Sequence, residues 1–105
     1  MAQFLYGNGL NAALADLFKN AEEYLVLISP YIKLHERYKD ELKSKLSVPN
    51  FQIQILFGKN EEDRSKSIND KDIEFFKTFA NVEIRYEKRL HAKFYYNEKA
   101  SILTS

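Results

Sequence analysis

The sequence has no cysteine and no tryptophan, and only 3 glycines and 2 prolines among its 105 residues. Without cysteine, the chain has no disulfide scaffold, no thiolate zinc site, no iron–sulfur cluster and no cysteine nucleophile. So little glycine and proline excludes collagen-like and linker-rich sequences. The 2 histidines are too few for a histidine cage around a metal, and no glycine-rich phosphate loop follows a strand. We therefore expect no metal and no cofactor.

An excess of charge of one sign is lacking as well. Lys and Arg number 16 against 15 Asp and Glu, for a formal net charge of +1, so nucleic-acid binding would have to rest on a local patch. The longest apolar run, residues 24–28, is far below the roughly 20 residues that span a bilayer. The first residues carry neither the basic nor the apolar region of a signal peptide. A soluble, cytoplasmic protein without membrane contact is the expectation.

What the sequence does contain is the composition of a single folded domain over residues 1–105, with 45% hydrophobic and 14% aromatic residues. Apolar residues at helical spacing predict helices, and short apolar or alternating runs predict strands. The helices are expected over 8–21, 34–46 and 70–79, and the strands over 24–29, 51–57, 82–86, 91–96 and 100–105. The polar stretch 61–67 is expected to be a loop.

This order, α-β-α-β-α-β-β-β, predicts an α/β fold with a mixed, mainly parallel sheet flanked by helices. The first three strands are joined by helices, which favours right-handed parallel crossovers. The last two strands are joined by a short turn, which favours an antiparallel hairpin. Because strand 24–29 is one continuous apolar run, we expect it to be covered on both faces of the sheet.

The segment Leu90-His91-Ala92-Lys93 carries the strongest chemical signal. On a strand, His91 and Lys93 point to the same face, roughly 7 Å apart at about 3.3 Å per residue. An anion between the two side chains would relieve the repulsion between their charges. Phosphate suits the pair, because lysine supplies a positive charge while an imidazole attacks phosphorus or donates a proton.

The final hairpin brings a hydroxyl group to this pair. If the turn centres on Glu98 and Lys99, Lys93 lies opposite Thr104, whereas a three-residue turn would bring Ser105 near Lys93. Either register supplies a side chain that binds a phosphate oxygen. The sequence leaves the choice between the two registers open.

His91-x-Lys93, the apolar strand after it, the turn 97–99 and the run 100–105 together resemble the signature of the phospholipase D superfamily. The family pattern is His-x-Lys, four residues, Asp, six residues and then Gly-Ser, usually with an Asn shortly after. The order of elements around strand 24–29 is also similar to that fold, which implies a phospholipase D-like half. The resemblance covers nearly the whole chain, although only its last quarter carries motif residues.

The resemblance implies a role for each matching residue. His91 matches the histidine that attacks phosphorus and forms a covalent phosphohistidine, and Lys93 matches the lysine that binds the phosphoryl oxygens. A strict count puts Glu98 at the position of the Asp, and a count one residue shorter puts Asn97 there. In the shorter count, Thr104 and Ser105 stand at the Gly-Ser position. These four residues are expected to support the phosphate. Since the sequence stops at Ser105, we expect the domain to lack the family's C-terminal helix.

The superfamily builds one active site from two such motifs. A chain with a single motif therefore resembles the members that dimerise and place one motif from each subunit across a two-fold axis. In that scheme one histidine attacks and the other protonates the leaving oxygen, without a metal. The resemblance thus implies a metal-independent hydrolase whose active site is shared across a homodimer.

The charge around the motif favours a phosphodiester of DNA or RNA as the substrate. Segment 85–99 has five basic and two acidic residues with tyrosines between them, a pattern typical of single-stranded nucleic-acid binding. Arg89 and Tyr95 are the candidate substrate contacts. A nuclease-like phosphodiesterase is therefore the first prediction. The alternative is a non-catalytic module of the same fold that binds phosphate or nucleic acid or serves dimerisation, which the replaced Asp and Gly of the motif favour.

Overall fold

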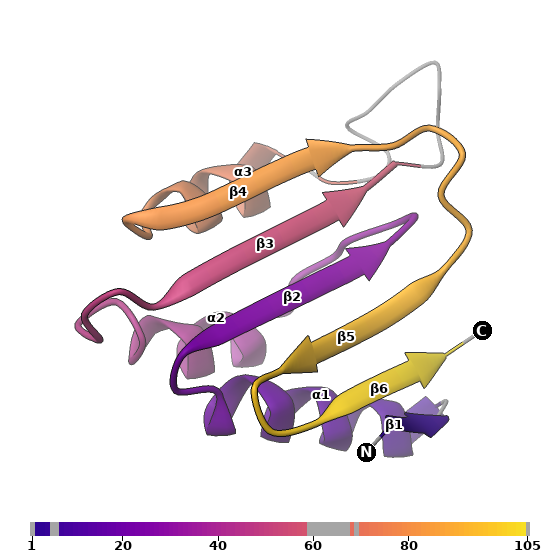
Figure 1. The fold of residues 1–105 in the computed structure, drawn as a ribbon, viewed down its shortest axis with the longest axis horizontal. Coiled ribbons are helices and arrows are strands. Elements are labelled where there is room, and N and C mark those ends of the chain that lie inside the picture. Colours follow the sequence, from indigo (N-terminus) through magenta and orange to yellow (C-terminus); the bar gives the residue numbers. More distant parts are fainter. Residues whose placement is uncertain (1, 5–6, 59–67, 69, 105) are drawn as a thin grey trace.

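In the computed structural model, the described part of the chain covers residues 2–4, 7–58, 68 and 70–104. The strands are β1 (Ala2–Phe4), β2 (Tyr24–Ser29), β3 (Gln52–Phe57), β4 (Asn81–Tyr86), β5 (Lys93–Asn97) and β6 (Ser101–Thr104), and the helices are α1 (Gly7–Asn20), α2 (Glu36–Lys43) and α3 (Asp70–Lys77) (Figure 1). The order differs from the predicted one by the additional strand β1, whose three residues are too few to show a period. The predicted loop 61–67 lies outside the described residues.

The six strands form one sheet in the order β1-β6-β5-β2-β3-β4. β2, β3 and β4 are parallel neighbours, as are β1 and β6, whereas β5 runs antiparallel to both β2 and β6. An α/β fold with a mixed sheet is therefore confirmed. The sheet is not mainly parallel, because β5 enters between β2 and β6 and makes both of its ladders antiparallel.

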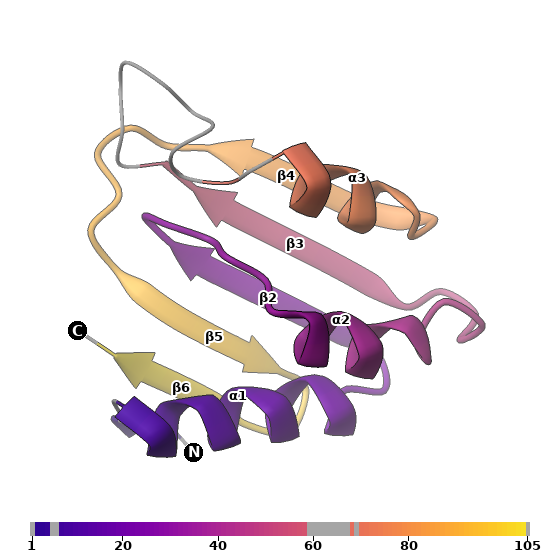
Figure 2. The same cartoon turned by 180° about the vertical axis from the view of Figure 1, so that it is seen from behind.

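All three helices lie on the same side of the sheet (Figures 1 and 2). Each helix presents an apolar stripe to the sheet; α2, for example, buries Tyr38 and Leu42, which are four residues apart. The core between the two layers contains Leu17, Phe18, Leu25, Leu27, Tyr38, Leu42, Ile53, Ile55, Phe57, Phe76 and Ile102. We call this side of the sheet the helix-covered face.

The opposite side, which we call the open face, carries no helix of the described chain (Figure 1). Its side chains on β2, β5 and β6 are Tyr24, Val26, Ile28, Phe94, Tyr96, Ser101 and Leu103, and those on β3 and β4 are Gln52, Gln54, Leu56, Asn81, Glu83 and Arg85. The expectation that strand 24–29 is covered on both faces is therefore wrong. Val26 is nevertheless only 8% exposed, because aromatic neighbours in the sheet shield it.

The ends of the parallel strands are tied together by backbone hydrogen bonds. β2 ends at Ser29 because Pro30, which follows, has no N–H to continue a ladder. The Gly58 N–H donates to the Pro30 carbonyl oxygen at 3.2 Å, and the Glu87 N–H donates to the Phe57 carbonyl oxygen at 2.8 Å.

Among the described helices, none combines the length and the apolar character that crossing a membrane requires.

Gly58, directly after β3, provides a test of this arrangement. Its φ is +121°, a region that residues with a Cβ rarely adopt, and an added Cβ would collide with the ring of Tyr86. We predict that Gly58→Ala lowers the free energy of unfolding by roughly 2–4 kcal/mol, measured by urea denaturation.

The double variant Gly58→Ala/Tyr86→Ala separates the two causes. Removing the ring removes the collision but not the backbone strain. The double variant should therefore lose less unfolding free energy than the sum of the losses in the two single variants. Strictly additive losses would contradict the collision.

Candidate functional site

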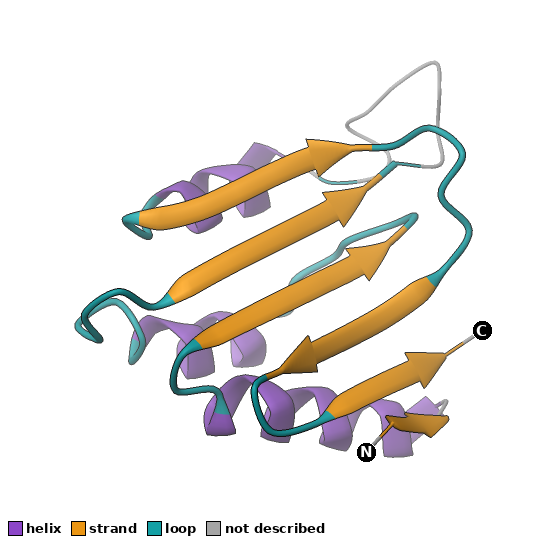
Figure 3. Cartoon of the chain, viewed as in Figure 1, coloured by secondary structure: helices purple, strands orange, loops and turns teal. Residues whose placement is uncertain are grey.

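Within the described chain, every strand except β5 ends at one edge of the sheet, and β5 begins there. We call this the carboxyl edge; its described residues are segments 30–35 and 87–92 together with Lys93 and Thr104. Segment 87–92 joins β4 to β5 and therefore passes the ends of β3 and β2 (Figure 3). Ligands of α/β sheets commonly bind at such an edge.

The β5–β6 hairpin places Lys93 at the carboxyl edge opposite Thr104. The Asn97 N–H donates to the Ala100 carbonyl oxygen at 3.0 Å, so the turn has two central residues. Of the two predicted registers, the one that pairs Lys93 with Thr104 is thus confirmed. Ser105, the partner in the other register, lies outside the described residues.

Lys93 also lies beside the end of β2. Phe94 pairs with Ile28, so Lys93 comes next to the last residue of β2, Ser29. The Lys93 side chain belongs to the helix-covered face and is half-buried. A half-buried ammonium group loses part of its hydration, which increases the benefit of binding an anion.

His91 lies in the connecting segment and not on a strand, and its side chain is exposed. The prediction that His91 and Lys93 share one face of a strand is wrong, because β5 begins at Lys93. The cause lies in the neighbouring strand: β2 stops at Ser29, and Pro30, which the register places opposite Ala92, has no N–H to extend the ladder as far as His91. The Cα atoms of His91 and Lys93 are still at most about 7 Å apart, since only one residue separates them.

The described part of the carboxyl edge is rich in positive charge. It has the basic side chains of Lys33, Lys88, Arg89 and Lys93 and a single carboxylate, that of Glu87. The backbone N–H of Arg89 donates to this carboxylate at 3.2 Å. None of the four basic side chains, nor that of His91, forms a hydrogen bond or an ion pair with a described residue. Such an unbalanced group of cations favours an anionic ligand.

Ser29 and Tyr95 form a buried polar contact beneath the edge. Ser29 is 1% exposed, and its hydroxyl donates to the Tyr31 carbonyl oxygen at 2.7 Å and accepts from the Tyr31 N–H at 3.3 Å. Burial raises the pKa of Tyr95 above its ordinary value of 10.0; the hydrogen bond with Ser29 opposes this shift and Tyr38 adds to it. Tyr95, a predicted substrate contact, therefore points toward the helices and secures the end of β2.

A cavity of about 80 Å³ lies beside this contact. Its polar lining comes from Tyr31, Lys33, Tyr38 and Tyr95, and its remaining walls are apolar. At roughly 30 Å³ per water molecule, the cavity has room for two or three waters but not for a nucleobase. A nucleotide substrate would therefore bind on the edge itself.

A buried ion pair fixes the segment that follows β2, and the sequence pattern did not reveal it. Asp72 of α3 is 2% exposed and accepts a hydrogen bond from the Leu34 N–H at 3.0 Å, while the Lys39 ammonium lies 3.1 Å from its other oxygen. The available signal was a carboxylate on the same helical face as Phe76. Its partner Leu34 is 38 residues away in the sequence, so local patterns do not identify it.

Asn97 and Glu98, both predicted to support the phosphate, lie at the opposite end of β5 from Lys93. Four residues along a strand correspond to about 13 Å. The structure therefore does not bring these two side chains to Lys93. Both have other partners near the start of β2.

Asn97 is 5% exposed, and its side chain joins the hairpin turn to α1. Its side-chain amide nitrogen donates to the Leu17 carbonyl oxygen at 2.8 Å. Its amide oxygen accepts from the N–H groups of Lys99 at 2.7 Å and Ala100 at 2.8 Å. A carboxylate could not donate to Leu17, so the amide is the chemically required group at this position.

The carboxylate of Glu98 accepts hydrogen bonds from the backbone N–H groups of Glu22, Glu23 and Tyr24, at 2.8, 3.1 and 3.2 Å. Burial by itself raises the pKa of Glu98, but these donors and its own N–H together lower the pKa below the ordinary 4.5. The negative charge at this position therefore stabilises the connection between α1 and β2.

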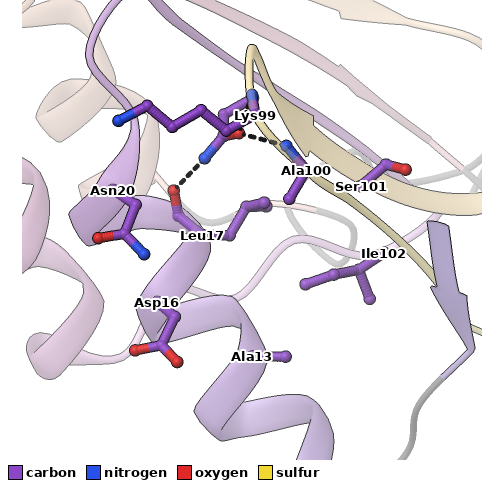
Figure 4. A pocket seen from close by; sticks show the side chains of 9 residues that line it. Ala13, Asp16, Leu17, Asn20, Lys99, Ala100, Ser101 and Ile102 are labelled. Carbon is purple, nitrogen blue, oxygen red and sulfur yellow. Dashed lines mark hydrogen bonds between the residues drawn. The ribbon is translucent and has the colours of Figure 1, made fainter. Parts of the chain in front are cut away.

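A cleft of about 290 Å³ lies between α1 and the turn of the β5–β6 hairpin (Figure 4). Asp16 and Asn20 of α1 and Lys99 of the turn contribute its charged and polar side chains. Lys99 is already paired with Glu22. The cleft is on the Asn97 side of the hairpin and is not part of the carboxyl edge.

No protein-family model, curated protein or solved structure matches the chain. The function is therefore argued from the carboxyl edge and its chemistry. Within the described ranges, no group of three His, Asp or Glu side chains is placed to hold a metal ion.

Asn97→Asp tests the role of the buried amide. The variant keeps the size of the side chain but sets a carboxylate oxygen against the Leu17 carbonyl oxygen. We predict a loss of roughly 2–4 kcal/mol in the free energy of unfolding at pH 7, partly recovered in acid as the new carboxyl group is protonated. Asn81→Asp, at an exposed position of β4, is the matched control and should change stability by less than about 0.5 kcal/mol. Equal effects at both positions would contradict the assignment.

Glu98→Gln tests the charge that the backbone donors stabilise. Because the folded-state pKa of Glu98 is lowered, its charge contributes stability above the ordinary pKa of 4.5, and this contribution is lost as the pH falls through the folded-state value. The difference in unfolding free energy between the parent chain and Glu98→Gln should therefore be largest near neutral pH and shrink in acid. Glu74→Gln, exposed on α3, controls for the loss of one negative charge. A difference that grows in acid would contradict the prediction.

Proposed function

We propose that the chain is one half of a metal-independent phosphodiesterase of the phospholipase D type, with His91 as the nucleophile and Lys93 as the phosphate ligand. The observation that carries the proposal is the carboxyl edge. There the exposed imidazole of His91 and the half-buried ammonium group of Lys93 are two residues apart in the chain, and neither has an ion-pair partner in the described chain. A phosphate group supplies the missing negative charge.

The first step of the proposed reaction transfers the phosphoryl group to the protein. An imidazole nitrogen of His91 attacks phosphorus, a P–N bond forms, and the P–O bond to the leaving oxygen breaks. The leaving oxygen takes a proton from a second histidine. Lys93 offsets the negative charge that develops on the non-bridging oxygens.

The second step regenerates the enzyme. A water molecule attacks the phosphohistidine, its proton goes to the second histidine, and the P–N bond breaks as the new P–O bond forms. The two steps together consume one water and return both histidines to their starting protonation states. His91 of a second copy of the chain supplies the second imidazole in a homodimer.

The other histidine of the chain, His35, is a weak candidate for this second role. It precedes α2, and its backbone carbonyl oxygen accepts from the N–H groups of Tyr38 and Lys39 at 3.0 and 3.1 Å. Its ring packs edge-on against Tyr38, with 5.8 Å between the ring centroids. His35 therefore has a structural environment and serves as a matched control.

The proposed substrate is a single-stranded nucleic acid. Its regularly spaced phosphates suit the cations of the edge, Lys33, Lys88 and Arg89, which flank the reacting pair. Tyr31 lies 48% exposed on the same edge and offers a ring on which a base can stack. Arg89 keeps its predicted role as a substrate contact.

The second candidate function is a binding module that holds phosphate or nucleic acid without cleaving it. One observation favours it: His91 lies on a connecting segment, and catalytic groups are held less rigidly on loops than on strands. Such a module would bind nucleic acid with a salt-dependent affinity that survives His91→Ala and falls in Arg89→Ala or Lys93→Ala.

The deciding experiment is cleavage of a single-stranded DNA oligonucleotide in the presence of EDTA. We predict cleavage by the parent chain and a loss of at least roughly 10³-fold in rate for His91→Ala and Lys93→Ala. His35→Ala is the matched control, because it changes the same residue type on the same edge. It should retain the parent rate, since the proposed reaction does not use His35.

Trapping in acid should reveal a phosphohistidine on the parent chain and not on His91→Ala. Cleavage that persists in His91→Ala would overturn the assignment of the nucleophile. Binding without cleavage by the parent chain would favour the binding module.

A further inference from the structure

The open face carries a partly exposed apolar patch over which no helix of the described chain packs. We call it the open-face patch; it consists of Tyr24, Val26, Ile28, Phe94, Tyr96 and Leu103. Phe94 and Tyr96 lie 5.1 Å apart between ring centroids, and Tyr24 and Tyr96 lie 6.2 Å apart. The patch therefore extends without interruption over β2, β5 and β6.

None of these six side chains belongs to the core between the sheet and the helices. The three helices all lie on the other side (Figure 2). Leu103 is 42% exposed, although leucine is usually buried in a sheet. A contiguous aromatic and aliphatic surface of this kind marks an interaction site.

We propose that the open face is the interface with a second copy of this chain. The first argument is area. Viewed down its shortest axis, as in Figure 1, the molecule extends 36 × 29 Å. The rectangle that encloses this outline measures about 1,000 Å², which sets the upper limit for one face, and a stable interface of standard size buries about 800 Å² per partner.

The second argument is charge. The open face of β2 to β6 has one carboxylate, Glu83, and one guanidinium, Arg85, and these two groups are paired with each other. The face is therefore neutral, so two copies meet without repulsion. Among its described residues, the open face of β2 to β6 offers a single-stranded nucleic acid aromatic rings but no unpaired cation for its phosphates.

The third argument is geometry. Sheets that pack face to face keep their strands within about 30° of each other. A two-fold axis parallel to the strands preserves the strand direction and brings the carboxyl edges of both copies to the same end of the assembly. The interface stands independently of the phosphodiesterase proposal, but this arrangement satisfies its need for two copies of His91 at one end.

The test is the mass of the chain in solution, measured by sedimentation over a range of concentrations. The parent chain should have the mass of two 12.4 kDa chains. Tyr96→Glu, which places a charge in the open-face patch, should weaken the dimer by at least tenfold. Leu46→Glu is the matched control, because Leu46 is 48% exposed away from the sheet, after α2, and this variant should remain dimeric. Circular dichroism checks that both variants are folded.

A second measurement does not depend on the stability of Tyr96→Glu. Since the chain has no cysteine, a single cysteine reports its own accessibility. Gln54 is exposed on the open face beside Val26, so alkylation of Gln54→Cys should slow several-fold as the protein concentration rises. Lys77→Cys, exposed on α3, should react at a constant rate.

Three results would overturn the proposal. The first is a parent chain that stays monomeric at every concentration. The second is a folded Tyr96→Glu that stays dimeric. The third is a monomer whose affinity for a single-stranded oligonucleotide falls in Tyr96→Glu, which would assign the face to nucleic-acid bases. His91→Ala should remain dimeric, so a loss of cleavage in a dimeric His91→Ala bears only on the nucleophile.

Discussion

The amide of Asn97 connects three parts of the fold that are distant in the sequence. It accepts from the N–H groups of Lys99 and Ala100 in the hairpin turn and donates to a carbonyl oxygen of α1, 80 residues earlier. The turn sets the register of β6, and the contact with α1 holds the end of β5 against the start of β2. With both fixed, the other end of β5 comes to the carboxyl edge with Lys93 opposite Thr104. The geometry of the candidate site therefore depends on a side chain about 13 Å away along the strand.

The sequence predicted those helices and strands that show a clear periodicity of apolar residues. Predictions failed mainly where residues far away in the sequence determine the structure. Strand 24–29 was found with its predicted bounds, because its continuous apolar run has no helical alternative of that length. The sequence did not show that helices cover only one face of this strand. An apolar run is compatible with shielding by helices or by aromatic neighbours in the sheet. The alternation of apolar and polar residues continues through His91, so the sequence predicted it to lie on a strand. The ladder between β2 and β5 stops before His91, because Pro30 in the neighbouring segment has no N–H to extend it. The pairing of Lys93 with Thr104 was predicted as one of two registers, and only the observed turn distinguishes them. The distance of Asn97 and Glu98 from Lys93 follows from strand geometry alone and was available from the sequence.

The two faces and the carboxyl edge of the sheet carry different kinds of side chain. The helix-covered face supplies the core, and the polar groups it buries, Ser29, Asp72 and Asn97, all hold ends of strands or connections in place. The carboxyl edge collects cations that have no ion-pair partner in the described chain. The open face is apolar over β2, β5 and β6 and neutral overall. The two proposals therefore assign different surfaces to the two ligands: the nucleic acid to the carboxyl edge and the second copy of the chain to the open face.

The position of β5 has a consequence for how the chain folds. β2 pairs on one side with β3, about 28 residues later, and on the other side with β5, where Leu25 meets Asn97. Closing the longer loop costs more chain entropy and slows folding. During synthesis, residues 24–57 can form their parallel pair early, but one side of β2 stays unpaired until residue 97 has left the ribosome. Over that interval a central, apolar strand is an exposed edge, which is the condition under which strands associate between chains.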